Sequence, residues 1–166
     1  MLLLYSSSTS ARLQYIVNFF SHELFDRPIR ITNDKEEYSS FRGAKLNYSQ
    51  KPIIPNEFHI SPVALLFEDG IRPQEINCFD YNFQKAFFRT EGTIPFDIFA
   101  ASFYLISRYE EYLPHTKDQY GRYDHSNSLA FKEGFLNQPV VNHWLAEFRK
   151  ELSSIYPFLK FRGREF

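Results

Sequence analysis

The stretch LLLYSSSTSARLQYIVNFFSHEL, residues 2–24, is the strongest indication of the fold because it predicts a strand, a turn and a helix in direct succession. The apolar run at residues 2–5 is typical of an interior strand. The serine-rich turn after it supplies a hydroxyl that can cap a helix. Apolar residues then recur at helical spacing, which predicts an amphipathic helix over residues 10–25. The residues on this apolar face are Leu13, Ile16, Val17, Phe20 and Leu24.

The pattern continues outward as a second strand, a second helix and a third strand. IRIT at 29–32 is a strand, KEEYSSF at 35–41 is a short helix, and AKLNYS at 44–49 is the next strand. This β-α-β-α-β order favours a layered α/β fold with parallel strands. The first turn has no Gly-x-Gly pattern for a dinucleotide. We therefore interpret its serines as helix caps, with an anion site at the helix N-terminus as the alternative.

The middle of the chain predicts further strands and a hairpin. Three prolines make residues 51–62 a connection or an edge strand. Strands are predicted at 63–71 (VALLFEDGI) and at 76–81 (INCFDY). DYNFQ then turns the second of these into KAFFRT, which gives a hairpin, so that we expect a mixed sheet.

Two C-terminal helices complete the prediction. Asp97 caps an apolar, largely buried helix at 98–106 that is expected to end by Leu113–Pro114. Residues 115–138 form a polar loop of a kind that often carries function, and Pro139 opens a final helix. The predicted fold class is α/β: a mixed β-sheet flanked by helices, with a β-α-β-α-β start, a hairpin and two C-terminal helices in a single domain.

Composition and charge exclude several classes of protein. The net charge of −1 provides no field that would gather nucleic acid or anionic lipid. No apolar run approaches the roughly 20 residues of a membrane span, and the N-terminus lacks the basic residues of a signal peptide. The single cysteine, Cys78, excludes an internal disulfide and a cysteine-based zinc site. We expect a cytoplasmic protein with no nucleic-acid or membrane partner.

The histidines do not predict a metal site. No pair has the His-x3-His or His-Glu-x2-His spacing that places two ligands on one helix face. The prediction is therefore no metal and no cofactor, although a site assembled from distant parts of the chain stays open. The five histidines are His22, His59, His115, His125 and His143.

A charged cluster after the buried helix is the best candidate site. Negative charge at Glu110 and Glu111 opposes the dipole at the end of a helix, so cations should compensate. Arg108 can reach Glu111 at the i,i+3 spacing. Adjacent residues point about 100° apart on a helix, which places these two carboxylates poorly as a glycosidase pair. The polar loop adds five candidates for a ligand or domain contact: His115, Asp118, Arg122, Asp124 and His125.

This cluster has three interpretations. The first is that its charges pin the polar loop at 115–138 to the helix end. The second is a site for a sugar or another ligand, and the third is a catalytic acid/base pair.

Several segments resemble one family over nearly the whole chain. They are KLNYS (45–49), LLFEDGIRPQEINCFD (65–80), AFFRTEGTIPFDIFAASFYLISRYEEYLP (86–114), GRY (121–123) and GFLNQPVVNHWL (134–145). The chain resembles the N-terminal region of bacterial polysaccharide-deacetylase-like proteins. In that family a domain of about this size precedes a NodB-type metal-dependent carbohydrate esterase domain. The Asp-Asp pair and His-x3-His helix that identify the esterase are absent here, so no catalytic residue is carried over.

Three hypotheses of function follow. The resemblance implies a non-catalytic accessory domain whose partner is a downstream deacetylase domain or a carbohydrate. A second hypothesis is a carbohydrate-binding module that uses exposed Tyr and Phe beside the charged cluster. The third is a small free-standing hydrolase that uses Glu110 or Glu111 with His115 or His125.

Overall fold

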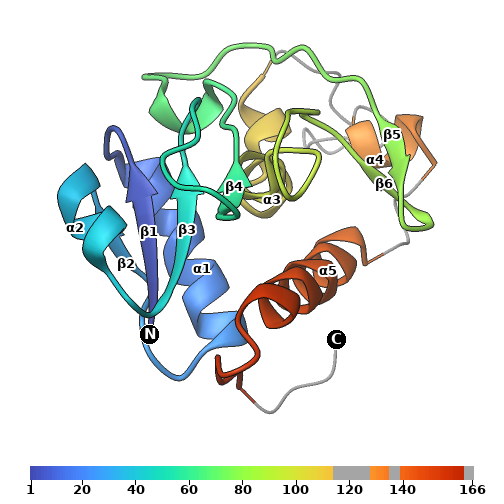
Figure 1. Ribbon diagram of the computed structural model, residues 1–166. Coiled ribbons are helices and arrows are strands. Elements are labelled where there is room, and N and C mark those ends of the chain that lie inside the picture. The colour runs from blue at the N-terminus through green and yellow to red at the C-terminus, as the bar shows by residue number, and fades with distance from the viewer. Residues whose placement is uncertain (114–127, 135–138, 163–166) are drawn as a thin grey trace.

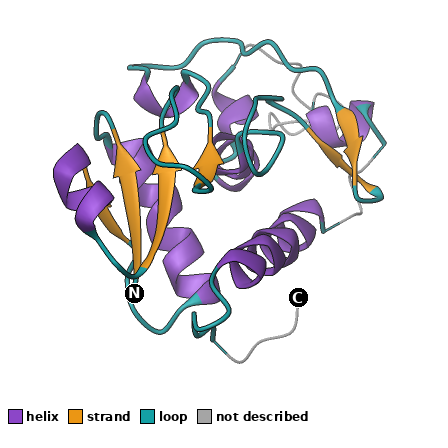
Figure 2. Cartoon of the chain, in the orientation of Figure 1, coloured by secondary structure: helices purple, strands orange, loops and turns teal. Residues whose placement is uncertain are grey.

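The computed structural model describes residues 1–113, 128–134 and 139–162, which form an α/β fold with two separate sheets (Figures 1 and 2). The predicted β-α-β-α-β start is confirmed. Its elements are β1 (Leu2–Ser6), α1 (Ala11–Leu24), β2 (Arg30–Thr32), α2 (Lys35–Ser40) and β3 (Ala44–Tyr48). The later elements are β4 (Phe58–Ile60), η1 (Leu65–Phe67), β5 (Phe79–Tyr81), β6 (Gln84–Ala86), α3 (Ile98–Ile106), η2 (Tyr109–Tyr112), α4 (Leu129–Lys132) and α5 (Val140–Ile155).

The larger sheet has the strand order β2-β1-β3-β4, and all of its neighbouring strands run parallel. β4 lies at the edge, as the prolines at residues 51–62 predict. In doubly wound sheets of this order the winding direction reverses between the first and third strands. Ligands of such folds bind outside the carboxyl ends of the strands at this point. The carboxyl ends of β1 and β3 are therefore a natural place for a site.

The sheet is covered by helices on both faces, because alternate residues of β1 enter different cores. Leu2 and Leu4 belong to the main core, which α1 joins. Leu3 and Tyr5 belong to a smaller cluster with Tyr38 of α2. In Figure 1, α1 and α2 lie on opposite sides of the sheet. The predicted layering is thus confirmed.

The predicted strand at residues 63–71 is wrong. This segment contains the short 3₁₀ helix η1, in which Leu65 and Leu66 are fully buried. Its apolar residues therefore enter the core from a turn, without strand pairing. A short apolar run does not by itself distinguish a strand from another buried segment.

The predicted hairpin is confirmed, with β5 antiparallel to β6 and Tyr81 opposite Gln84. It forms a sheet of its own, so parallel and antiparallel pairing are both present but in separate sheets. The hairpin packs beside α5, where the Trp144 Nε1–H donates to the Lys85 carbonyl at 3.1 Å. This contact with α5 explains why the hairpin lies away from the parallel strands (Figure 1).

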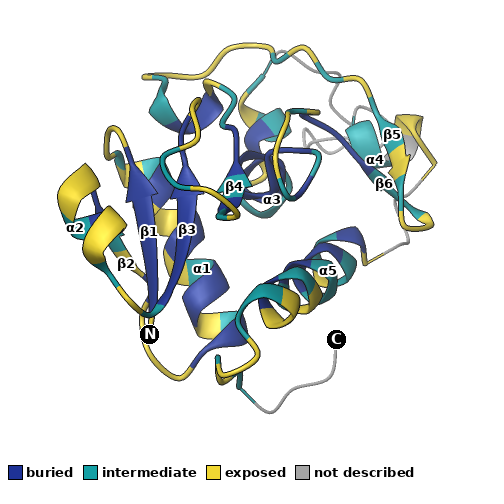
Figure 3. Ribbon diagram, in the orientation of Figure 1, coloured by how far each residue is buried: buried dark blue, intermediate teal, exposed yellow. Residues whose placement is uncertain are grey.

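The two predicted C-terminal helices are α3 and α5. α3 is buried over most of its length, and α5 places a single apolar face against the core (Figure 3). Aromatic rings hold the helices together: the Phe20 ring lies 4.8 Å from that of Phe99 and 5.2 Å from that of Phe148. Within the region predicted as a polar loop, the described part contains the short helix α4.

Candidate functional site

The buried helix predicted at 98–106 is confirmed as α3, which ends at Ile106, before the expected limit of Leu113–Pro114, because Arg108 adopts a left-handed backbone conformation with φ of 57°. The Arg108 N–H donates to the Leu105 carbonyl at 3.3 Å, which closes the last turn of α3. Glycine is the usual residue where a helix ends in this way. Glu110 and Glu111 therefore lie in the separate 3₁₀ helix η2, and their prediction in the last turn of an α-helix is wrong.

Two of the three charged residues in this cluster pair with each other, and the third contacts a later segment of the chain. Arg108 forms an ion pair with Glu111, as their spacing predicts. Glu110 Oε1 accepts a hydrogen bond from the Leu129 N–H at 2.8 Å, at the start of α4. Glu110 thus ties η2 to a segment 19 residues later in the chain. This contact agrees with the interpretation that the cluster fastens the loop to the end of the helix.

The remaining candidates of the cluster lie outside the described residues. They are His115, Asp118, Arg122, Asp124 and His125. Their predicted part in a ligand or domain contact stays a prediction. Of the two tyrosines in η2, Tyr109 is 2% exposed and Tyr112 is 71% exposed. Only Tyr112 of this pair can therefore offer its ring to a ligand at the surface.

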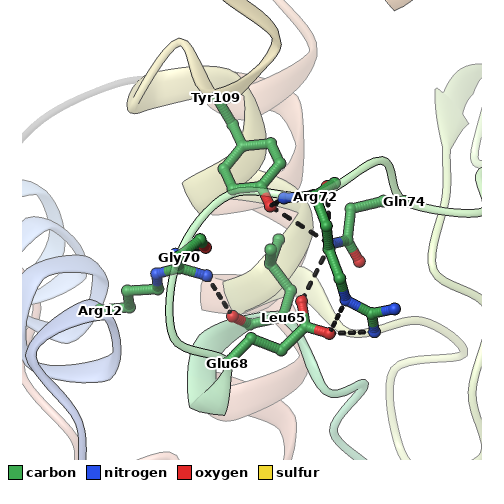
Figure 4. A network of polar contacts seen from close by, with 7 residues as sticks. All are labelled: Arg12, Leu65, Glu68, Gly70, Arg72, Gln74 and Tyr109. Carbon is green, nitrogen blue, oxygen red and sulfur yellow. Dashed lines mark hydrogen bonds and ion pairs between the residues drawn. The ribbon is translucent and has the colours of Figure 1, made fainter. Parts of the chain in front are cut away.

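Tyr109 anchors η2 to the loop that follows η1 (Figure 4). Its hydroxyl accepts from the Arg72 N–H at 2.8 Å and donates to the Arg72 carbonyl at 2.9 Å. The Arg72 side chain pairs with Glu68, which also accepts from the Gln74 side-chain amide at 2.9 Å. The bond from Arg72 lowers the pKa of the Glu68 carboxyl. The predicted cluster is thus one side of a larger polar network that the sequence does not reveal.

Arg12 joins this network from the first turn of α1 (Figure 4). Its guanidinium donates to the Leu65 carbonyl at 2.8 Å and to the Gly70 carbonyl. It also lies 5.7 Å from the centroid of the Tyr109 ring and 5.8 Å from that of Phe103. These cation–π distances are within the range in which an aromatic face attracts a cation. Arg12 therefore holds α1, the loop and η2 together.

A pocket of about 450 Å³ lies beside Arg12, at the carboxyl end of β1. Ser10 is the N-cap of α1: its Oγ accepts from the Leu13 N–H at 3.0 Å and donates to the Leu66 carbonyl. The interpretation of this serine as a cap is confirmed. Glu68 and Asp69 line the same pocket, and their negative charges disfavour the alternative of an anion site. The lining residues are Ser8, Thr9, Ser10, Ala11, Arg12, Leu66, Phe67, Glu68, Asp69 and Gly70.

Asp97 is a fully buried carboxylate that sequence reasoning identified only as a helix cap. The cap is confirmed, since Oδ1 accepts from the Ala100 N–H at 3.0 Å. Oδ2 accepts from the Tyr48 hydroxyl at 2.6 Å and from the Val63 N–H at 2.9 Å. Burial raises the pKa of Asp97 to about 6 although these hydrogen bonds act in the opposite direction. The side chain is enclosed, which makes it a structural group and not a site open to a substrate.

A second polar network lies on the α2 face of the sheet. The Lys45 ammonium donates to the carbonyls of Tyr38 and Phe41, each at 2.9 Å. Burial lowers the pKa of Lys45. Glu57 accepts from the Tyr38 hydroxyl at 2.8 Å and from the Asn47 amide at 3.0 Å. These groups satisfy one another, so the network has a structural explanation.

The described residues do not bring metal ligands together. Within 1–113, 128–134 and 139–162, no group of three His, Cys, Asp or Glu side chains is placed to hold a metal ion. Cys78 is half-buried, and burial, followed by the charge of Glu133, raises the pKa of its thiol to about 11. A raised thiol pKa disfavours the thiolate that a nucleophile or a metal ligand requires. Among the described helices, none combines the length and apolar character needed to cross a membrane.

Comparison with known proteins places the chain in a family. No curated protein and no solved structure matches it significantly. A family model described as "Family of unknown function (DUF7033)" matches residues 2–157, nearly the whole chain. This match spans the parallel sheet, the hairpin and all but the last part of the C-terminal segment. The chain therefore belongs to the DUF7033 family.

Proposed function

We propose that this chain is a non-catalytic accessory domain of a polysaccharide-deacetylase-like protein, in which a separate esterase domain performs the chemistry. The resemblance of its segments to the N-terminal regions of such proteins motivates the proposal. Its role is to position the esterase domain or to present carbohydrate to it.

The observation that carries the proposal is the separation of the two adjacent carboxylates. Glu110 accepts from the Leu129 N–H and Glu111 pairs with Arg108. A glycosidase-type acid/base pair needs two carboxyl groups that face each other across a cleft. Here each carboxylate is used in a contact that organises the polypeptide. This arrangement favours a non-catalytic accessory domain over a catalytic domain.

The reading frame beyond Phe166 tests the proposal. An Asp-Asp pair after a strand and a His-x3-His helix in the next few hundred residues are the expected result, because such residues hold a divalent metal and activate water. A frame that stops directly after Phe166, or that continues without these motifs, would contradict the proposal.

A carbohydrate-binding module is the second candidate, favoured by the pocket beside Arg12. Its lining combines the hydroxyls of Ser8 and Thr9 with the Asp69 carboxylate, beside Glu68, which already accepts from Arg72 and Gln74. Donors and acceptors of this kind suit a neutral polyhydroxyl ligand better than an anion. The position outside the carboxyl end of β1 is also where doubly wound folds bind ligands.

Calorimetric titration with a panel of neutral oligosaccharides tests this candidate. Binding in the millimolar range or tighter is expected, with loss of most affinity in Asp69→Asn. Asp80→Asn is the matched control, because Asp80 is an exposed aspartate paired with Lys85 on the distant hairpin. Absence of heat with every sugar, or equal loss in both variants, would argue against a sugar site in this pocket.

The third hypothesis, a small hydrolase, stays a prediction. It requires His115 or His125, which lie outside the described residues. The contacts of Glu110 and Glu111 do not favour it, since both carboxylates already have partners.

A further inference from the structure

The tip of the β5–β6 hairpin holds an aromatic residue in an unfavourable backbone conformation. Tyr81 pairs with Gln84, which leaves Asn82 and Phe83 as a two-residue turn. Both have positive φ, 47° and 71°. This is the pattern of a type I′ turn, in which Asn-Gly is strongly preferred. A residue with a Cβ in the left-handed region costs roughly 1–2 kcal/mol, so Phe83 strains the turn that it occupies.

The Phe83 side chain also contributes no burial. It is 101% exposed. The β5–β6 hairpin itself lies at the edge of the molecule (Figures 1 and 3). Glycine at this position would relieve the strain and remove an apolar ring from water. A strained residue whose side chain does nothing for the fold points to a function outside the fold.

The hairpin that carries Phe83 is firmly braced. The Asn82 side-chain amide donates to Glu147 Oε2 at 2.8 Å, and Trp144 donates to the Lys85 carbonyl. Behind the turn, the Tyr81 ring lies 5.2 Å from the Phe96 ring. A side chain presented on a rigid support loses little conformational entropy when it binds. Phe83 is therefore arranged as a preorganised anchor.

The surroundings of Phe83 indicate what it can bind. The Asn82 side-chain amide donates a hydrogen bond to Glu147, and Asp80 forms an ion pair with Lys85 at 3.1 Å. A sugar stacked on a ring needs accessible hydrogen-bonding groups beside that ring, but Asn82 and Asp80 are already paired and the Gln84 side-chain oxygen is buried. An apolar pocket of a folded protein makes no such demand, and buried aromatic anchors dominate protein interfaces.

The charges around the hairpin restrict the partner further. Burial raises the pKa of Tyr81 to about 12, and the nearby charges of Glu147 and Glu151 act in the same direction. The Glu147 carboxylate lies at the turn, where it accepts from Asn82 at 2.8 Å, whereas the charge of Asp80 on β5 is balanced by Lys85. An acidic border disfavours an anionic membrane surface and favours a partner pocket with a basic rim.

We propose that Phe83 anchors this domain in an apolar, basic-rimmed pocket on the esterase domain of the same polypeptide. The proposal rests on the proposed function and adds to it the surface through which the two domains meet. The esterase domain covers the ring and the turn, and Phe83 fills the centre of the contact.

A tryptophan probe in the full-length protein tests this docking. The chain has a single tryptophan, Trp144, which is fully buried and serves as an internal reference. Phe83→Trp places a second indole at the tip. Phe158→Trp is the matched control, because Phe158 is another exposed aromatic residue, at 65%. Acrylamide quenching and emission wavelength of both variants are compared with a free tryptophan derivative.

The expected result is a blue-shifted emission for Phe83→Trp and quenching several-fold weaker than for Phe158→Trp, independent of protein concentration. Equal, strong quenching in both variants would overturn the docking. Protection that disappears on dilution would assign the contact to a second copy of the chain and overturn it as well. Protection of Phe158→Trp alone would place the domain contact elsewhere.

The proposed function fails separately, by the absence of an esterase domain from the reading frame. In that case the docking proposal falls with it. An esterase domain that is present while the indole at position 83 stays exposed overturns only the docking.

Discussion

At the scale of single residues, Asp97 joins three parts of the fold through one buried carboxylate. Its oxygens accept from Tyr48 on β3, from the Val63 N–H after β4 and from the Ala100 N–H of α3. Burial of Asp97 disfavours its charged form because the carboxylate loses its hydration, and this raises the pKa of Asp97 to about 6. Stability should therefore depend on the protonation of this one group.

The first prediction concerns this pH dependence. The folded-state pKa of about 6 is above the ordinary value of 3.8, so the contribution of Asp97 is complete below about pH 4 and is lost as pH rises through about 6. Two pKa units correspond to about 3 kcal/mol as an order of magnitude. The free energy of unfolding of the natural protein minus that of Asp97→Asn should fall by this amount between pH 4 and 7 in urea titrations.

A difference between the two proteins that is constant from pH 4 to 7 would show that Asp97 does not titrate in this window. A difference in the free energy of unfolding that grows with pH would show that the hydrogen bonds lower the pKa of Asp97 more than burial raises it.

The second prediction concerns the hairpin turn. Phe83→Gly should raise the free energy of unfolding by about 1 kcal/mol, because glycine adopts the left-handed conformation without a Cβ clash. The gain is limited by the greater freedom of glycine in the unfolded chain. Thermal unfolding monitored by circular dichroism measures it, with Phe83→Ala as control. Destabilisation by Phe83→Gly would show that the ring contributes to the fold itself.

At the scale of elements, the end of α3 decides what the charged cluster can do. Arg108 stops the helix in a left-handed conformation, and η2 then directs Tyr109 into the loop network. The two glutamate side chains contact different residues: Glu110 accepts from the Leu129 N–H, and Glu111 pairs with Arg108. The cluster is therefore a junction between α3, the loop after η1 and α4.

The third prediction separates the two glutamates. Glu110→Ala removes the acceptor for the Leu129 N–H and should destabilise α4 by about 1 kcal/mol, as the loss of a helix cap does. Amide hydrogen exchange across residues 128–134 should become correspondingly faster. Glu111→Ala is the matched control, since it removes a partly exposed ion pair with Arg108 that is worth up to about 1 kcal/mol. Equal exchange in both variants would refute a specific role of Glu110.

Elements with a strong local signal could be predicted from the sequence. The β-α-β-α-β start follows from period and capping residues, because each unit buries one regular face. Asp97 was identifiable as a cap because an acidic residue directly precedes an apolar run. The pairing of Arg108 with Glu111 follows from helical spacing, which a 3₁₀ turn preserves closely enough.

Features that depend on distant contacts could not be predicted. The strand expected at 63–71 has an apolar pattern that η1 satisfies equally well, and no local signal distinguishes the two. Arg108 carries no glycine or asparagine signal for the end of a helix. The bonds of Tyr109 to Arg72 join residues 37 positions apart, and those of Asp97 to Tyr48 join residues 49 apart.

At the scale of the whole molecule, the two surfaces for which we propose a function lie on different elements. The polar pocket lies beside Arg12 outside the parallel sheet, and Phe83 projects from the separate hairpin. An accessory domain with one surface for carbohydrate and another for a partner domain would use both. Both surfaces lie within residues 2–157, the part of the chain that matches the DUF7033 family model.

Acetate release from an acetylated oligosaccharide in the presence of a divalent metal tests the proposed accessory role most directly, when it is measured side by side for residues 1–166 alone and for a protein in which they precede the proposed esterase domain. We expect metal-dependent acetate release by the longer protein and none by residues 1–166 alone. Metal-dependent release of acetate by the 166-residue chain alone would contradict that role.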